Sequence, residues 1–337
     1  MALALATTAS AQENPLWLRH CAISPDGSTV AFAYKGDIYT VPATGGNARQ
    51  LTTNSAHDSY PVWSPDSKQL AFCSNREGSM DVYVMNREGG APRRLTTNSG
   101  TETPIAFKDN NTVLYVSSIM PTAQSILFAN GSLPQVYEVS TNASRPRLFS
   151  ALPMMDISIR PNGDLLYHDQ KGYEDPLRKH HRSPITRDIW LRRAGKYTKL
   201  TNFNGEDRTP VWAAQGDSFY YLSEEDGTFN VYKRNIDGTD KQQLTRHTTN
   251  PVRFLTAATD GTLCYGYDGE IYTLKQGAQP QKLKVNIVTD KTDKDLDRQT
   301  LFTGATEISL SPDGKELAFV LHGDVYVTSM DYRTTKQ

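Results

Sequence analysis

The sequence predicts an all-β fold, a β-propeller of four-stranded antiparallel blades, and three observations carry this prediction. A unit marked by an aromatic residue recurs seven times, with separations of 44, 54, 53, 42, 40 and 54 residues between successive marks. The strand-like runs are apolar at consecutive positions, as from Leu70 to Cys73, whereas a sheet with one wet face would alternate. No stretch shows helical periodicity of comparable strength. A repeat of about 40–45 residues whose strands are buried on both faces is typical of propeller blades, because each blade is sandwiched between two others.

Each unit begins with a short strand and a tight turn. The turn has the form Ser-Pro-Asp-Gly, in which Pro presets φ and Gly tolerates a positive φ. The motif copies begin at Ile23, Trp63 and Leu310, and weaker copies begin at Phe107, Ile159, Trp212 and Thr256. We expect Trp63 and Trp212 to lie at equivalent core positions of innermost strands. The apolar run that follows each turn is the second strand.

The third and fourth strands have landmarks of their own. The third contains an apolar residue and then an aromatic one: Ile38-Tyr39, Val82-Tyr83, Val136-Tyr137, Ile189-Trp190, Val231-Tyr232, Ile271-Tyr272 and Val325-Tyr326. The fourth is marked by a leucine that threonine usually follows: Leu51, Leu95, Leu148, Leu200, Leu244 and Leu283. Four strands are therefore predicted in each unit.

The spacing of the units predicts a six-bladed propeller over residues 12–286. A charged and weakly patterned stretch follows, and we interpret residues 287–303 as a linker. The seventh unit, residues 304–337, is then the first blade of a second propeller. The alternative is a closed seven-bladed propeller, in which this unit completes the ring. Because the sequence stops where the next leucine landmark is due, we expect a fragment of a longer polypeptide.

The first residues are similar to the end of a secretory signal peptide. Residues 1–11 are small and apolar, and they end in Ala9-Ser10-Ala11, an A-x-A cleavage pattern. We therefore expect an exported, periplasmic protein, with a disordered apolar start as the alternative. No other stretch approaches the roughly 18 apolar residues of a membrane span, so we expect no membrane insertion.

Composition excludes several classes of function. The chain has 36 Lys and Arg against 37 Asp and Glu, so it lacks the basic stripe that binds nucleic acid. Its three cysteines form no C-x-x-C pair, which argues against a disulfide framework or a zinc site. There is no G-x-S-x-G, H-E-x-x-H or phosphate-loop motif. We therefore assign no catalytic residue, no metal ligand and no cofactor.

Two segments contain candidate binding residues. The insertion from His168 to Asp188 interrupts the fourth unit, and loops on rigid scaffolds often carry function. It could contact a peptide, a neighbouring domain or subunit, or only solvent. The second segment, at a crossing between blades, could line one mouth of a central channel, although its charges could equally pair within the loop. The candidate residues are Arg178, His180, His181, Arg182, Glu206, Asp207 and Arg208.

The repeat resembles that of TolB-type, WD40-like propellers, as in "WSPDSKQLAF" and "DVYVM". A closer resemblance is to the N-terminal propeller of tricorn-like proteases. It is carried by the opening "CAISPDGSTVAFAYKGDIYTVPATGGNARQLTTN", the inserted "GYEDPLRKHHRSPITRDIW" and the "FNGEDRTPVW" that follows. The resemblance implies a serine-peptidase core in a later part of the parent protein, propellers that filter or guide peptides, and large homo-oligomers. The archetype is cytoplasmic, so a cytoplasmic location stays open.

Two hypotheses of function follow. In the first, the chain is the non-catalytic propeller portion of a tricorn-like serine protease; its partners are peptides and the C-terminal domains of the parent. In the second, it is a stand-alone exported TolB-like propeller that binds a protein partner through one face. A lyase or glycosidase on this propeller is a distant third, because no paired-carboxylate spacing is visible.

Overall fold

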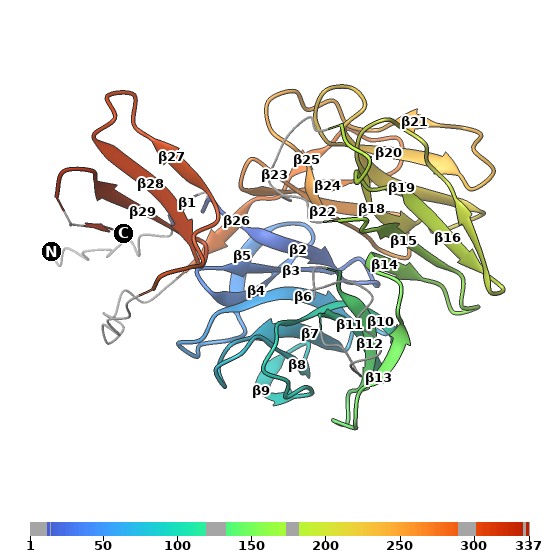
Figure 1. The fold of residues 1–337 in the computed structure, drawn as a ribbon, viewed down its shortest axis with the longest axis horizontal. Coiled ribbons are helices and arrows are strands. Elements are labelled where there is room, and N and C mark those ends of the chain that lie inside the picture. The colour runs from blue at the N-terminus through green and yellow to red at the C-terminus, as the bar shows by residue number, and fades with distance from the viewer. Residues whose placement is uncertain are drawn as a thin grey trace, which may run out of the picture.

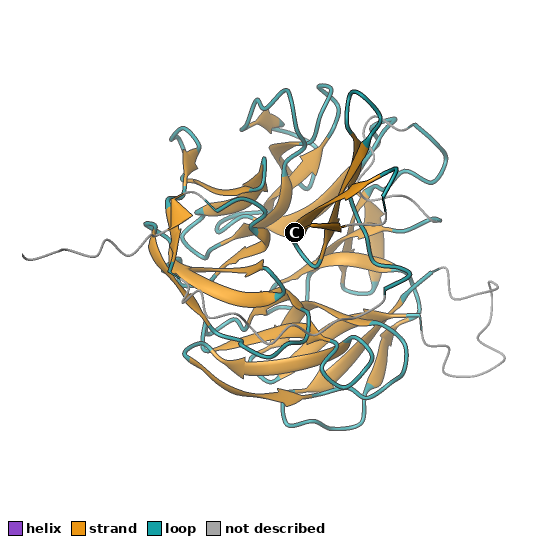
Figure 2. Cartoon of the chain, turned by 90° about the vertical axis from the view of Figure 1, so that its left-hand side faces the viewer, coloured by secondary structure: helices purple, strands orange, loops and turns teal. Residues whose placement is uncertain are grey.

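Every regular element of this chain is a β-strand, within the residues that the structure describes. The computed structural model describes residues 12–13, 15–118, 133–172, 182–288, 301–332 and 335–336. Figure 2 shows strands and loops throughout these ranges. The expected signal peptide and most of the expected linker lie outside them. The all-β prediction is confirmed.

The first three blades are four-stranded antiparallel units, and blade 1 has two further strands at its outer edge. Blade 1 consists of β2 (Arg19–Ile23), β3 (Thr29–Tyr34), β4 (Asp37–Pro42) and β5 (Gly46–Gln50); blade 2 of β6 (Asp58–Trp63), β7 (Gln69–Ser74), β8 (Asp81–Asn86) and β9 (Gly89–Arg94); and blade 3 of β10 (Glu102–Asp109), β11 (Thr112–Ser117), β12 (Gln135–Ser140) and β13 (Arg147–Ser150).

The remaining strands form three more blades and a separate C-terminal sheet. Blade 4 consists of β14 (Met154–Ile159), β15 (Leu165–Asp169), β16 (Ile189–Arg193) and β17 (Lys196–Lys199); blade 5 of β18 (Asp207–Trp212), β19 (Ser218–Ser223), β20 (Asn230–Asn235) and β21 (Gln242–Gln243); blade 6 of β22 (Arg253–Ala257), β23 (Leu263–Tyr267), β24 (Glu270–Leu274) and β25 (Gln281–Lys282); and the C-terminal sheet of β27 (Ile308–Leu310), β28 (Glu316–Leu321), β29 (Asp324–Ser329) and β30 (Thr335–Lys336).

Six blades contact one another in a circular order. The innermost strands β2, β6, β10, β14, β18 and β22 each contact the next, and β22 contacts β2 again. The C-terminal sheet takes no place in this order and stands to one side of the ring in Figure 1. The ring therefore holds six blades, and the seven-bladed alternative is not what the structure shows.

Blade 6 and blade 1 are separate sheets, joined by buried side chains and by backbone hydrogen bonds such as that from Leu18 to Gly269. Cys21 and Phe32 of blade 1 belong to the same buried cluster as Cys264 and Ile271 of blade 6. The chain then returns to the outer edge of blade 1. There β26 (Val285–Ile287) pairs in parallel with β5, and β1 (Gln12–Glu13) pairs with β26. The segment that follows blade 6 is therefore attached to blade 1.

The Ser-Pro-Asp-Gly turn is held by its own side chains. The Asp26 carboxylate accepts hydrogen bonds from the Ser24 hydroxyl (2.6 Å) and the Ser28 amide (3.0 Å), and the Ser24 oxygen accepts from the Thr29 amide (3.1 Å). Gly27 has a φ of +72°, which explains the glycine. These bonds close the first hairpin, so the motif predicts its turn for a local reason.

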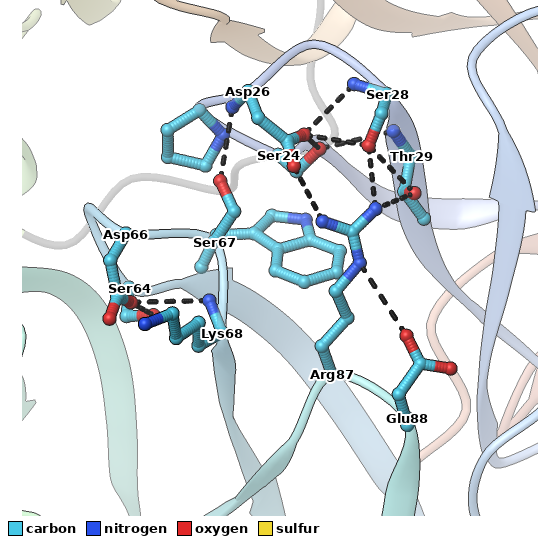
Figure 3. Close-up of polar contacts among 12 residues, drawn as sticks. Ser24, Asp26, Ser28, Thr29, Ser64, Asp66, Ser67, Lys68, Arg87 and Glu88 are labelled. Atoms are coloured by element: carbon cyan, nitrogen blue, oxygen red, sulfur yellow. Dashed lines mark hydrogen bonds and ion pairs between the residues drawn. The ribbon is translucent and has the colours of Figure 1, made fainter.

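A neighbouring blade supports the same turn. The Arg87 guanidinium, at the turn after β8, donates to Asp26 (2.6 Å) and to the Thr29 hydroxyl (2.5 Å) of blade 1 (Figure 3). The hydrogen bonds that Asp26 accepts keep the pKa of its carboxyl well below the usual value. The Ser67 hydroxyl of blade 2 also accepts from the Asp26 amide at 3.0 Å. The turn motif is therefore a joint between blades as well as a hairpin.

The leucine-threonine landmark also has a structural role. In blade 1 the Leu51 amide donates to the carbonyl of Ile38 (2.8 Å), and the Thr52 hydroxyl accepts from the Ile38 amide (2.9 Å). Blades 2, 4 and 5 repeat this clamp on Val82, Ile189 and Val231. In blade 3 the predicted leucine, Leu148, lies within the fourth strand β13, where it pairs with Tyr137 and is 45% exposed.

The two tryptophans lie where the repeat predicted. Trp63 ends β6 and Trp212 ends β18, and both are buried on innermost strands of separate blades. The Trp63 indole also donates to the carbonyl of Ala22 in blade 1 at 2.9 Å. The equivalence of these two positions is confirmed.

Candidate functional site around the propeller axis

A β-bulge interrupts every innermost strand of the six blades. In β6, for example, the pairing with β7 shifts between Ser59 and Val62, and β2, β10, β14, β18 and β22 have a shift at the corresponding place. In each blade we take the residue that lies three positions before the last residue ahead of the first turn; in blade 2, for example, Trp63 precedes the turn and Tyr60 is the residue taken. We call these six residues the axial ring: His20, Tyr60, Pro104, Asp156, Thr209 and Phe254.

Five axial-ring residues have a left-handed backbone although none is glycine. Their φ values lie between +48° and +58°. Such conformations cost on the order of 1–3 kcal/mol each and cluster at functional sites. The sixth residue is Pro104, whose ring holds φ near −65°. Blade 3 accordingly has the shorter register shift, between Pro104 and Ala106.

Two residues of the axial ring retain solvent exposure on their innermost strands, whereas Pro104 is buried. Tyr60 is 45% exposed and the Asp156 side chain is 42% exposed. These two residues belong to blades 2 and 4, which are not neighbours in the ring. The axial ring is thus open to solvent at these two positions.

One half of the ring is aromatic. The His20 and Tyr60 rings are stacked with centroids 3.8 Å apart, and the Phe254 ring meets His20 edge-on at 4.9 Å. Burial, Arg19 and His57 lower the pKa of His20 to about 3. His20 is therefore neutral at physiological pH and contributes a flat, uncharged surface.

The opposite half is polar. The Thr209 hydroxyl donates to Asp156 at 2.7 Å, and the Thr209 amide donates to His168 Nδ1 at 3.3 Å. Burial, together with Arg187 and Arg208, keeps the pKa of His168 well below its usual value. A neutral His168 can accept the hydrogen bond from the Thr209 amide, and this bond supports the left-handed backbone of Thr209.

The sequence-predicted residues Glu206, Asp207 and Arg208 lie just before and at the start of β18. Both Arg208 and Arg187 form ion pairs with the same oxygen of the buried Glu206, Arg208 at 3.1 Å. The Arg208 guanidinium also lies 4.3 Å from the centroid of the Phe229 ring, and burial lowers its pKa to about 10. These contacts fit the reading in which the charges pair within the crossing loop.

The buried Asp207 has a raised pKa. Burial raises it to about 6, opposed by hydrogen bonds from Ser223 and Thr201. Of the candidates in the insertion, Arg178, His180 and His181 lie outside the described residues, and Arg182 is exposed. A binding role for all seven stays a prediction.

Acidic residues recur where a blade begins. Asp58 is buried and accepts two hydrogen bonds from Arg76, at 3.0 and 2.9 Å. At the next crossing, burial and the nearby Asp81 raise the pKa of Glu102 to about 7. Among the described residues no cluster of histidine, cysteine or acidic side chains is arranged to hold a metal ion. Asp58 therefore pairs within its own blade, whereas Glu102 lies near an acidic residue of the preceding blade.

A cavity of about 370 Å³ lies between blades 1 and 6. Phe254 of the axial ring and Glu307, just before β27, are both in its wall, so the cavity connects the ring to the C-terminal sheet. Its other walls include Trp17, Arg253 and Tyr267, which combine aromatic surface with a cation. This mixture suits a peptide better than a purely apolar ligand.

Sequence reasoning missed the axial ring. Its members share a position but no residue type, so no alignment of residue identities finds them. The available signal was the distance of three residues from the residue that precedes each turn. Within the described residues, no helix is long and apolar enough to span a membrane.

Comparisons with known proteins place the fold. A family model described as the tricorn protease N-terminal beta propeller domain matches residues 15–280. Tricorn protease homolog 1 of Streptomyces coelicolor is 28% identical over 271 residues, which cover 78% of this chain and 24% of that protein. The tricorn protease of Thermoplasma acidophilum is 22% identical over 328 residues, 90% of this chain and 28% of that protein. The chain thus spans about a quarter of the length of these relatives.

Solved structures agree with that placement. A crystal structure of the tricorn protease has a TM-score of 0.68 at 20% identity, over 94% of this chain and 30% of that one. TolB from Acinetobacter baumannii has a TM-score of 0.55 at 12% identity, over 92% of this chain and 63% of that one. At these identities the likeness shows the propeller fold alone.

Proposed function

The chain belongs to the family of tricorn protease N-terminal β-propeller domains, and from this premise we propose that it guides peptides past the axial ring of a tricorn-like serine protease. In this proposal the chain contributes no catalytic group. The catalytic core and the remaining partners belong to other parts of the parent protein, which can assemble into a homo-oligomer. Peptides are the substrate class.

The axial ring is the observation that carries the proposal. Strained residues at one position of five blades are costly, and such strain persists where function requires a fixed geometry. An aromatic half and a hydrogen-bonding half together suit an extended peptide, which has apolar side chains and a polar backbone. The bulges direct these side chains, since a bulge changes the direction of a strand locally.

The C-terminal sheet fits the start of a second propeller. Its strands leave apolar side chains exposed, with Ile308 at 67% and Leu310 at 56%, although the equivalent Ile23 of blade 1 is buried. We therefore propose that a further blade covers this face in the parent protein. Export to the periplasm also remains a proposal, resting on residues 1–11.

Photo-crosslinking tests the peptide path. Tyr60→p-benzoylphenylalanine places a crosslinker in the axial ring, and Tyr197→p-benzoylphenylalanine is its control on the outermost strand β17. The two tyrosines are equally exposed, at 45% and 44%. Both variants are irradiated with a peptide pool from digested casein, and adducts are identified by mass spectrometry. We expect adducts at position 60 at least several-fold above position 197; equal yields would reject the path.

The TolB-like binding module remains the second candidate, supported by the shared fold of the Acinetobacter baumannii protein. It predicts retention of a folded protein from envelope extract without peptide adducts at position 60. The two candidates are therefore separated by the same pair of variants.

A further inference from the structure

The C-terminal sheet touches the propeller through a pair of histidines. The His322 ring, in the turn between β28 and β29, stacks on the His57 ring just before β6, with centroids 4.4 Å apart and planes 18° apart. Gly323 follows with a φ of +88°, and a Cβ there would lie 3.5 Å from the Lys35 amide nitrogen. The tip of this turn is thus in close contact with blades 1 and 2.

Opposite charges accompany the stack. Arg19 of blade 1 donates to Glu307 at 2.8 Å, and Lys35 lies 3.6 Å from Asp324. The propeller supplies both cations and the C-terminal sheet both anions. The Arg19–Glu307 pair is partly buried, with side chains 20% and 29% exposed, so solvent screens it less than an ordinary surface pair.

We propose that the His57–His322 stack is an acid-sensitive latch, which holds the C-terminal sheet against the propeller at neutral pH and releases it in mild acid. The proposal is independent of peptide guidance. It concerns the contact between two parts of this chain, and it would operate whichever ligand the axial ring receives.

The latch depends on uncharged imidazoles. Two neutral rings can stack, whereas two imidazolium rings at this distance repel each other. Arg19 adds positive charge on the propeller side, whereas the buried His20 is uncharged. A protonated His57 would therefore be repelled by Arg19 as well as by a protonated His322. The adjacent Asp58 cannot offset it fully, because Arg76 already engages both of its oxygens.

The titration of both rings agrees with this geometry. Burial lowers the pKa of His57 to about 4, with His322 and Arg19 contributing. Burial also lowers the pKa of His322, although Asp324 opposes that shift. On the sheet side Glu307 is paired with Arg19, and on the propeller side Lys35 is paired with Asp324.

The direction of the pH effect follows from these shifts. A released histidine has a pKa near 6.5, so docking is fully favoured above that pH and weakens as the pH falls toward 4. Each pKa unit separating the docked from the released state changes the docking equilibrium about tenfold. Protonation near pH 5 should therefore favour release.

Release would change access to the axial ring. Glu307 forms part of the wall of the cavity that Phe254 also lines. When the C-terminal sheet moves, that wall moves with it. The latch would thus couple acidity to the opening beside blades 1 and 6.

Hydrogen exchange of the 337-residue chain at pH 7.5 and pH 5.0, corrected for intrinsic exchange rates, tests the latch. We expect lost protection at residues 35–36, 56–58 and 320–324 at pH 5.0, while β3 and β7 stay protected. Small-angle X-ray scattering should show a larger radius of gyration at pH 5.0. The double variant His57→Gln/His322→Gln should lose this pH dependence.

Controls separate the latch from general acid effects. His247→Gln removes a histidine that stacks on Tyr267 in the propeller, away from this contact, and should leave the pH response unchanged. Glu307→Gln should loosen the contact at both pH values. Equal protection of the contact at the two pH values, an unchanged response in the double variant, or simultaneous loss of protection in β3 and β7 would each overturn the proposal.

Discussion

The Thr209 hydroxyl donates a 2.7 Å hydrogen bond to the Asp156 carboxylate and so joins the axial-ring positions of blades 5 and 4. Both residues have a left-handed backbone, with φ values of +52° and +48°. The bond therefore connects two strained bulges of adjacent blades, and it holds the polar half of the ring in place.

Thr209→Val should destabilise the protein by about 1 kcal/mol, because it removes this hydrogen bond while keeping the side-chain shape. Urea denaturation monitored by tryptophan fluorescence measures the change. Thr53→Val, at an exposed loop position, is the matched control and should change stability little. Equal effects of the two substitutions would show that the bond contributes nothing measurable.

Arg87→Ala should loosen the joint between blades 1 and 2. Arg87 bonds Asp26 and Thr29 and lies 5.7 Å from the centroid of Trp63. Because the ion pair is partly exposed, the expected loss is only about 1 kcal/mol in the free energy of unfolding. Arg93→Ala on the exposed edge strand β9 serves as the control, and thermal unfolding compares them. A loss no greater than that of the control would contradict this role.

Gly45→Ala should weaken the attachment of β26 to blade 1. A Cβ at Gly45 would lie 2.7 Å from the Lys284 carbonyl oxygen, closer than atoms of a real side chain approach. We expect a cost of about 1–3 kcal/mol beyond the backbone strain, as in other overpacked sites. Gly163→Ala is the control, because its φ of +88° matches the +86° of Gly45 and nothing lies within 4 Å. Similar losses in the two variants would exclude the clash.

Glu102→Gln should stabilise the protein at alkaline pH. Burial raises the pKa of Glu102 to about 7, above the value near 4.3 of an unfolded chain. The protonated carboxyl group therefore stabilises the folded protein fully below about pH 4, and this stabilisation is lost as the pH rises through 7. We compare the free energy of unfolding of the variant with that of the native chain at each pH. The difference in favour of the variant should be larger at pH 8 than at pH 4, by on the order of 1–2 kcal/mol.

Chemical denaturation at the two pH values measures this difference. The control is Glu88→Gln, since the Glu88 side chain is 76% exposed and should contribute little. A Glu102→Gln profile that runs parallel to the native profile would mean that Glu102 ionises normally in the folded protein.

The sequence alone determined the blade, because the forces that build a blade are local or periodic. Ser24 and Asp26 close their turn within a few residues, and the Thr52 hydroxyl satisfies a backbone amide of its own blade. Aromatic and β-branched runs bury both faces of a strand whatever the neighbouring blade contains. The same repeated signal occurs in all seven units, so their number and order could be read directly.

Only the tertiary structure decided how the units close and what lies at the axis. Six blades complete the ring because blade 6 packs against blade 1, while β26 returns to the outer edge; neither contact has a local pattern. The axial ring joins residues of unlike type, and its members meet only because the blades converge. His57 and His322 are 265 positions apart in the sequence, a separation over which sequence periodicity carries no information about proximity.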